Sequence, residues 1–169
     1  MLVIKDSMVL IHLAKITLLE TACAYFGRVE IPEKVFSETV TVGKEKGHED
    51  AIIIENAIKS GAIKVRKVKK PELVKKANDF SIYGGEAEAL ALYWLEEADL
   101  LATDDDNVRR KKELLDLKLI GTPAIILKLF NSKKIDSKKA KQSAAKLRKI
   151  GWFSSDVTDR ILNEVEKNE

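Results

Sequence analysis

The chain has little of what several classes of protein and site require. It has one cysteine, Cys23, in 169 residues, so an internal disulfide is excluded. Its two histidines, His12 and His48, stand far apart, which gives little support to a zinc site or a Ser-His-Asp triad. No apolar run approaches the roughly 20 residues of a membrane-spanning helix, and no secretory leader pattern is present. We therefore expect a soluble, cytoplasmic protein without a membrane segment.

The charge of the chain is nearly balanced. It has 30 Lys and Arg against 27 Asp and Glu, a net charge of +3, which does not by itself indicate a nucleic-acid partner. The basic residues concentrate at 64–76, 109–112 and 133–149. Each segment is either a face that contacts phosphates or an ordinary solvated helix surface. Composition alone therefore leaves nucleic-acid binding open.

Short apolar runs alternate with longer helical patterns, which predicts βαβ units and an α/β fold. We expect strands at 1–5, 28–31, 62–68, 99–103 and 117–120. We expect helical segments at 7–27, from 32 onward, and at 50–60, 84–98, 106–116, 122–130, 136–149 and 154–166. In particular, Ile52, Ile53 and Ala57 are predicted to face inward, the 62–68 strand to lie at an edge, and Thr122 to cap its helix. The length predicts one compact domain.

Carboxylates follow two of the predicted strands. Asp6 ends the first, and the motif "LLATDDDNVRR" places Asp104, Asp105 and Asp106 after another. Ligands of open parallel sheets bind outside the carboxyl ends of the strands, so these acids are expected to converge. Glu38 and Glu86 lie on helices that could face the same crevice. Hard divalent cations prefer such oxygen ligands and can activate water against a phosphodiester.

Each acid also has an ordinary structural interpretation. Glu86 in a first helical turn complements the helix dipole, and Asp104 or Asp105 can cap the helix that begins near Asp106. Asp6 is harder to explain in this way, because an aspartate in an apolar segment costs stability unless it is paired, hydrogen-bonded or metal-bound. The combination of acids, rather than any one of them, favours a site. Without a metal, one carboxylate should have a raised pKa.

The ordered segments "IKDSMVLIHLAK", "IPEKVFSE", "GGEAEALALY" and "LLATDDDNVRR" resemble the motif series of PIN-domain ribonucleases. Within that superfamily the chain is most similar to a group with a Gly-Glu-Ala-Glu-Ala third motif, whose members resemble VapC-type toxins. The resemblance implies a three-layer PIN-like α/β fold, with a central, mainly parallel sheet flanked by helices. It places the nuclease domain at 1–130 and a C-terminal helical extension, packed on the same domain, at 131–169. It also implies RNA hydrolysis with Mg²⁺ or Mn²⁺.

The resemblance assigns roles to individual residues. The four catalytic acids are Asp6, Glu38, Glu86 and Asp105, and the metal ligands are Asp6, Glu86, Asp104 and Asp105, with Asp105 ranked before Asp104. The family often has Asp at the position of Glu86.

Other positions have supporting or outer roles. Ser7 and Thr103 match polar positions that orient metal-bound water. Glu88 should point away from Glu86, and Asp106 should face solvent. Arg109 and Arg110 are candidate RNA contacts, although a solvated helix face explains them equally well.

Other functions remain open at this stage. A PIN-like fold can serve as a non-catalytic RNA- or protein-binding module. A haloacid-dehalogenase-type phosphatase needs an Asp-x-Asp motif after the first strand, whereas this chain has Met8 two residues after Asp6. A response-regulator receiver domain needs an acid pair near the first strand, which this chain also lacks. A toxin and an RNA-processing enzyme share one active site, and relatives imply a small antitoxin partner and a homodimer. Core packing explains the C-terminal apolar residues better than a partner surface does; these are Ile150, Trp152, Phe153, Ile161, Leu162 and Val165.

Overall fold

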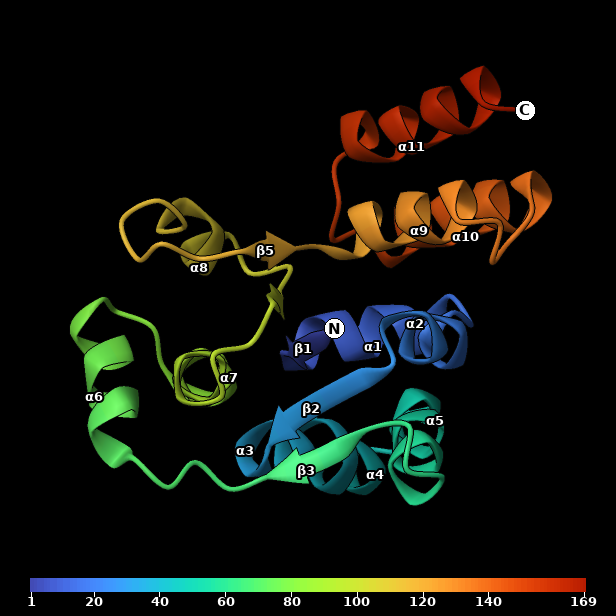
Figure 1. Cartoon of the computed structure of the whole chain (residues 1–169). Helices are drawn as coiled ribbons and strands as arrows, with labels where there is room; N and C mark the ends of the chain where they lie inside the picture. Colours follow the sequence, from blue (N-terminus) through green and yellow to red (C-terminus); the bar gives the residue numbers. More distant parts are fainter.

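Five short strands form one parallel sheet in the computed structural model, which describes residues 1–169. They are β1 (Leu2–Lys5), β2 (Arg28–Pro32), β3 (Lys64–Arg66), β4 (Leu100–Ala102) and β5 (Leu119–Ile120). Their spatial order is β3-β2-β1-β4-β5, and every neighbouring pair is parallel (Figure 1). The central strand β1 is buried along its whole length, as expected for a sheet covered on both faces. The predicted α/β class and the edge position of the 62–68 strand are confirmed.

Helices cover both faces of the sheet (Figure 1). One face carries α3 (Glu33–Phe36), α6 (Pro71–Asp79) and α7 (Gly84–Leu95). The other carries α1 (Ser7–Lys15), α2 (Leu19–Phe26), α5 (Glu49–Lys59) and α9 (Thr122–Asn131). The predicted three-layer arrangement is therefore confirmed. No helix combines the length and the apolar character that crossing a bilayer requires.

The C-terminal helices α10 (Ser137–Ile150) and α11 (Ser155–Lys167) pack against each other and against α9. Gly151 separates them with a φ of 76°, a left-handed conformation that glycine adopts without strain. Leu147, Ile161 and Val165 are buried in the same apolar core as β1. Trp152 is the exception among the C-terminal apolar residues, since 53% of it is exposed. A domain boundary near residue 130 stays a prediction.

The segment 7–27 forms two helices where one was expected. The break is at Thr17, which has a φ of 59°, and Leu18 N donates to Leu13 O at 2.9 Å across the turn. Ile16 and Leu19 on either side of the break are both buried. The chain therefore turns where burial on both sides of the break outweighs the cost of a left-handed residue.

The predicted inward face of α5 is wrong for two residues. Ile52 and Ile53 are 53% and 42% exposed, whereas Ala51 and Ile54 are buried. The rotation of α5 is set by a close approach to Gly43, at which an added Cβ would lie 2.8 Å from the Ala51 Cβ. Apolar residues outnumber the inward positions here, so the sequence pattern did not determine which of them face inward.

Three local predictions also differ from the structure. The helix α6 was not expected, and the helix expected at 106–116 is only α8 (Asp106–Arg110), followed by turns. The cap of α9 is Gly121, because the hydroxyl of Thr122 donates to Asp104 instead of to its own helix. After β2 the chain forms α3, a single π-helical turn at Ser37–Thr41, and α4 (Val42–Glu45).

Candidate active site

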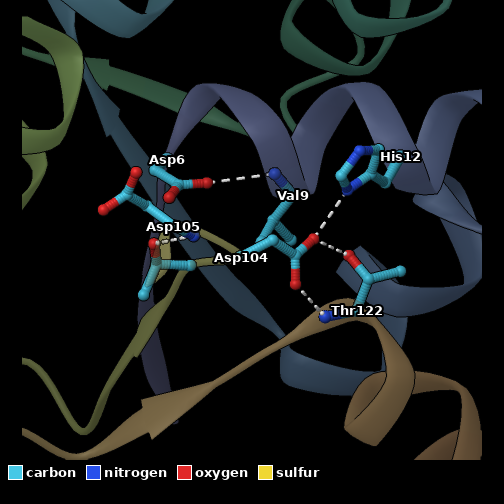
Figure 2. Close-up of polar contacts among 7 residues, drawn as sticks. Asp6, Val9, His12, Asp104, Asp105 and Thr122 are labelled. Carbon is cyan, nitrogen blue, oxygen red and sulfur yellow. Dashed lines mark hydrogen bonds and ion pairs between the residues drawn. The ribbon is translucent and has the colours of Figure 1, made fainter. Parts of the chain in front are cut away.

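Asp6 and Asp105 lie at the adjacent carboxyl ends of β1 and β4. The Asp6 N–H donates to Ala102 O at 3.0 Å, which joins the two strand ends directly. Each aspartate caps the helix that follows it: Asp6 Oδ1 accepts from Val9 N at 3.0 Å (Figure 2), and Asp105 Oδ1 accepts from Val108 N at 2.8 Å. The connections from β1 and β4 lead to opposite sides here, which creates the crevice where α/β proteins bind ligands.

The second carboxylate oxygen of Asp6 has no hydrogen-bond partner. Asp6 is only 1% exposed, and its Oδ2 is buried without a donor. Burial raises the pKa of Asp6 to about 8, and the negative charges of Asp104 and Glu86 add to the rise. The Thr103 hydroxyl and the Val9 N–H oppose it. A buried carboxylate in this state requires a proton or a cation.

Glu38 is held in place by two donors from other elements. It lies in the π-helical turn Ser37–Thr41, a conformation found frequently at functional sites. Ser7 Oγ donates to its Oε2 at 2.6 Å, and Gly85 N donates to its Oε1 at 3.0 Å. An added Cβ at Gly85 would lie 2.4 Å from Glu38 Oε2, so only glycine fits at that position without moving the carboxylate.

Glu86 lies among the other acids, half-buried in the first turn of α7. Burial raises its pKa, and the charges of Glu38 and Asp105 raise it further. The structure therefore makes neighbours of Asp6, Glu38, Glu86 and Asp105, four acids from four separate segments. Glu88, as predicted, points elsewhere: its Oε2 accepts from Lys34 N at 3.2 Å.

Asp104 points away from Asp6 and Asp105 (Figure 2). Its Oδ2 contacts His12 Nδ1 at 2.7 Å and accepts from Thr122 Oγ1, and its Oδ1 accepts from Thr122 N at 2.7 Å. The residue is only 4% exposed. These contacts tie the end of β4 to α1 and α9, a connection that the sequence analysis missed. The position of His12 on a buried apolar helix face was the available signal, because a polar group there needs a partner.

The remaining predicted residues lie around this site. Thr103 Oγ1 accepts from Asp105 N at 3.1 Å, which fixes the turn before α8. Asp106 is exposed, as predicted. Arg110 folds back along its helix and donates from Nε to Asp106 O at 3.3 Å. The Arg109 side chain makes no hydrogen bond or ion pair and lies against Gly121.

The acids offer oxygen donors only, which is the donor chemistry that Mg²⁺ and Mn²⁺ prefer. The unpartnered Oδ2 of Asp6 and the raised pKa values of Asp6 and Glu86 fit a cation at this place. No three Asp, Glu, His or Cys side chains are arranged to hold a metal ion in this structure, however. The site therefore has the chemistry of a hard-cation site without a preformed group of three ligands.

A protein-family model matches nearly the whole chain. The model of the family DUF3368, described as a PIN domain, matches residues 2–167. No curated protein and no solved structure matches the sequence significantly. PIN domains are generally nucleases and typically use divalent metal ions. Because the match spans both the acid cluster and the C-terminal helices, the chain belongs to the PIN-domain family DUF3368.

Proposed function

We propose that the protein is an endoribonuclease that hydrolyses RNA phosphodiester bonds with Mg²⁺ or Mn²⁺ bound at the acid cluster. The observation that carries this proposal is the buried, unpartnered Oδ2 of Asp6 at the junction of β1 and β4. An oxygen in that state destabilises the fold unless it serves a proton or a cation. The Gly-Glu-Ala-Glu-Ala motif and the ordered acids support the same activity through their resemblance to PIN-domain ribonucleases.

In this proposal some residues bind the metal and others position the groups that bind it. We assign Asp6, Glu86 and Asp105 to the metal and Glu38 to the acidic wall beside it, where Ser7 and Gly85 orient its carboxylate. The bound metal would polarise the phosphodiester and activate water.

Asp104 and Thr103 have different roles in this proposal. Both oxygens of Asp104 are occupied by His12 and Thr122, so we assign it a positioning role rather than the ligand role that the sequence suggested. Thr103 positions Asp105 through the backbone N–H.

Arg109 and Arg110, which follow the three aspartates, differ in whether their side chains are free to contact RNA. The Arg109 guanidinium has no partner within the chain and is free to bind a phosphate oxygen. Arg110 is already bonded to its own helix, which favours a structural role. Phosphate contacts of this kind position the RNA and carry no sequence information.

The test is cleavage of a labelled single-stranded RNA panel with Mg²⁺, Mn²⁺ or EDTA. The parent is compared with Asp6→Asn and Asp105→Asn, since Asn keeps both helix caps. Asp106→Asn is the matched control, because Asp106 is the exposed neighbour in the same acid run. We expect metal-dependent cleavage by the parent and the control, and loss of at least about a hundredfold in both site variants, the range of one positioned catalytic group.

Two outcomes count against the proposal. Cleavage by the Asp6→Asn and Asp105→Asn variants at the rate of the parent would mean that a contaminating ribonuclease is responsible. Absence of cleavage with either metal, in protein whose circular dichroism shows retained folding, would contradict the activity for these substrates.

A non-catalytic RNA- or protein-binding module is the second candidate. One observation favours it: the acids form no ready group of three metal ligands. Calorimetric titration with Mn²⁺ separates the two functions. Binding that depends on Asp6 supports the nuclease, and RNA binding without metal binding supports the module.

We further propose that the nuclease is a VapC-like toxin with a small antitoxin partner. A homodimer and a cytoplasmic location are part of this more specific proposal. It is supported by the motif resemblance alone. Ile161 and Val165 are buried in the core, so they leave little apolar surface on α11 for a partner. Growth arrest on expression in a bacterial host, relieved by Asp6→Asn, would support the toxin role.

A further inference from the structure

A cavity lies beside Asp104. Its volume is about 400 Å³, within the range of small-molecule sites. It is bounded by α8, the start of α9 and α11, and its walls are mostly apolar, with Pro123, Leu127, Phe153 and Ile161 among them. Asp104 is its only acid, and the next residue, Asp105, belongs to the acid cluster. The two sites are therefore one residue apart along the chain.

Three cations line this cavity, and none of their side chains has a partner. Arg109, Lys112 and Arg160 make no side-chain hydrogen bond or ion pair within the chain. The other four arginines are all bonded: Arg28, Arg66, Arg110 and Arg148. The only acid in the lining is already occupied by His12 and Thr122. The cavity therefore has an uncompensated positive charge above an apolar wall.

This combination selects a class of ligand. A purely apolar molecule would leave the cations unused, and inorganic phosphate would leave the apolar wall and Phe153 unused. A nucleotide uses both, because its phosphate pairs with guanidinium groups and its base packs on apolar and aromatic side chains. We propose that the cavity binds one nucleotide of the RNA next to the scissile phosphodiester, with its phosphate between Arg109 and Arg160 and its base against Phe153. The RNA identity of the ligand rests on the proposed function.

The geometry at Gly121 supports this placement. An added Cβ at Gly121 would lie 2.8 Å from Arg109 Nη1 and 3.0 Å from Asp104 Oδ1. The guanidinium of Arg109 therefore sits at the boundary between the cavity and the buried Asp104 cluster. A phosphate there would lie beside Asp104, the residue next to Asp105 of the acid cluster.

The first test is binding of adenosine 5′-monophosphate by calorimetry in EDTA, a condition in which the acid cluster repels phosphate. We expect saturable binding that weakens at least about tenfold in Arg160→Glu, because one charge-assisted hydrogen bond is lost and a carboxylate faces the phosphate instead. Ala124→Trp should weaken binding similarly by filling the cavity from an exposed wall position. Lys138→Glu is the matched control, because Lys138 is an exposed, unpaired cation on α10 outside the cavity, and this variant should bind as the parent does.

Several results would overturn the proposal: no binding by the parent at millimolar nucleotide, equal binding by Arg160→Glu, or inorganic phosphate binding as tightly as the nucleotide. Tighter binding of an oligoglutamate peptide would indicate a protein partner instead of RNA.

Cleavage assays separate this proposal from the nuclease itself. Arg160→Glu should raise KM about tenfold with kcat unchanged, because the residue binds substrate away from the reacting atoms. Nucleotide binding by a parent that cleaves no RNA would support the cavity and contradict the nuclease. RNA cleavage whose KM is unchanged by Arg160→Glu and Ala124→Trp would support the nuclease and contradict the nucleotide site in the cavity.

Discussion

The backbone N–H of Gly85 donates to Glu38 Oε1 at 3.0 Å, and this contact leaves no room for a side chain at position 85. An added Cβ would lie 2.4 Å from Glu38 Oε2. The flexible end of the glutamate must then move, which breaks its hydrogen bond with Ser7. The second glycine of the "GGEAEA" motif is therefore a steric requirement of the acid cluster.

We predict that Gly85→Ala lowers RNA cleavage at least about tenfold with little loss of stability. The moved carboxylate affects activity, whereas alanine favours the helix by about 0.5 kcal/mol or more. In a Glu38→Ala background the clash is absent. Adding Gly85→Ala to that variant should therefore raise its free energy of unfolding and leave its activity unchanged. Urea denaturation and initial cleavage rates measure both effects. Full activity of Gly85→Ala would show that the position of Glu38 is unimportant.

Asp104→Asn is predicted to destabilise the protein by about 1–3 kcal/mol even in EDTA, because a neutral amide replaces the carboxylate that His12 and Thr122 contact, and hydrogen bonds to a charged group are the stronger ones. Thr122 donates to Asp104 from both its backbone N–H and its hydroxyl. Asp106→Asn, at an exposed position, should stay within about 0.5 kcal/mol of the parent. If Asp104 served only a metal, its neutralisation would leave metal-free stability unchanged or improved. Chemical denaturation of the two variants in EDTA distinguishes these roles.

The position of the acid cluster was predictable because it follows from topology. Carboxyl ends of neighbouring parallel strands meet at one edge, so Asp6 and Asp105 had to approach once the strands were recognised. The direction of each side chain was not predictable in the same way. In a run of three aspartates the sequence does not say which one faces inward, and the contact of Asp104 with His12 joins residues 92 positions apart.

Other differences have equally local causes. The turn at Thr17 between α1 and α2 depends on how neighbouring helices pack in the core, which hydrophobic periodicity does not encode. The same holds for the exposure of Ile52 and Ile53. The π-helical turn that carries Glu38 has no sequence signature, so the sequence pattern supported Glu38 less strongly than the other acids.

We predict that the stability of the metal-free protein falls as pH rises from about 4 to about 8. The folded pKa of Asp6, about 8, lies above its ordinary value of 3.8, so across this window the folded state keeps a proton that the unfolded state has lost. The free energy of unfolding should then decrease by at most ~1.4 kcal/mol per pH unit from this group. Asp6→Asn should remove that slope, and Mg²⁺ should restore stability at pH 8 to the parent only. Denaturation series in EDTA and in Mg²⁺ measure both; a parent slope equal to that of Asp6→Asn contradicts the prediction.

Lys5 is predicted to destabilise the fold that contains it. It is fully buried in β1, with Nζ 3.9 Å from Cys23 Sγ and 5.4 Å from the centroid of the Phe26 ring. Burial lowers its pKa, and the neighbouring Cys23 only partly opposes this. Lys5→Met keeps the volume and removes the buried amine, so it should raise the free energy of unfolding by about 1–4 kcal/mol at pH 7.

The pH dependence tests the cause of this gain. A lysine with a lowered folded pKa gives a stability that rises with pH, because the unfolded state holds its proton longer, up to the ordinary value of 10.5. The advantage of Lys5→Met should therefore shrink as pH increases toward that value. Lys15→Met, at an exposed position on α1, is the matched control and should change stability by less than about 0.5 kcal/mol. A loss of stability in Lys5→Met, with the control unchanged, would mean that the Lys5–Cys23 contact stabilises the core.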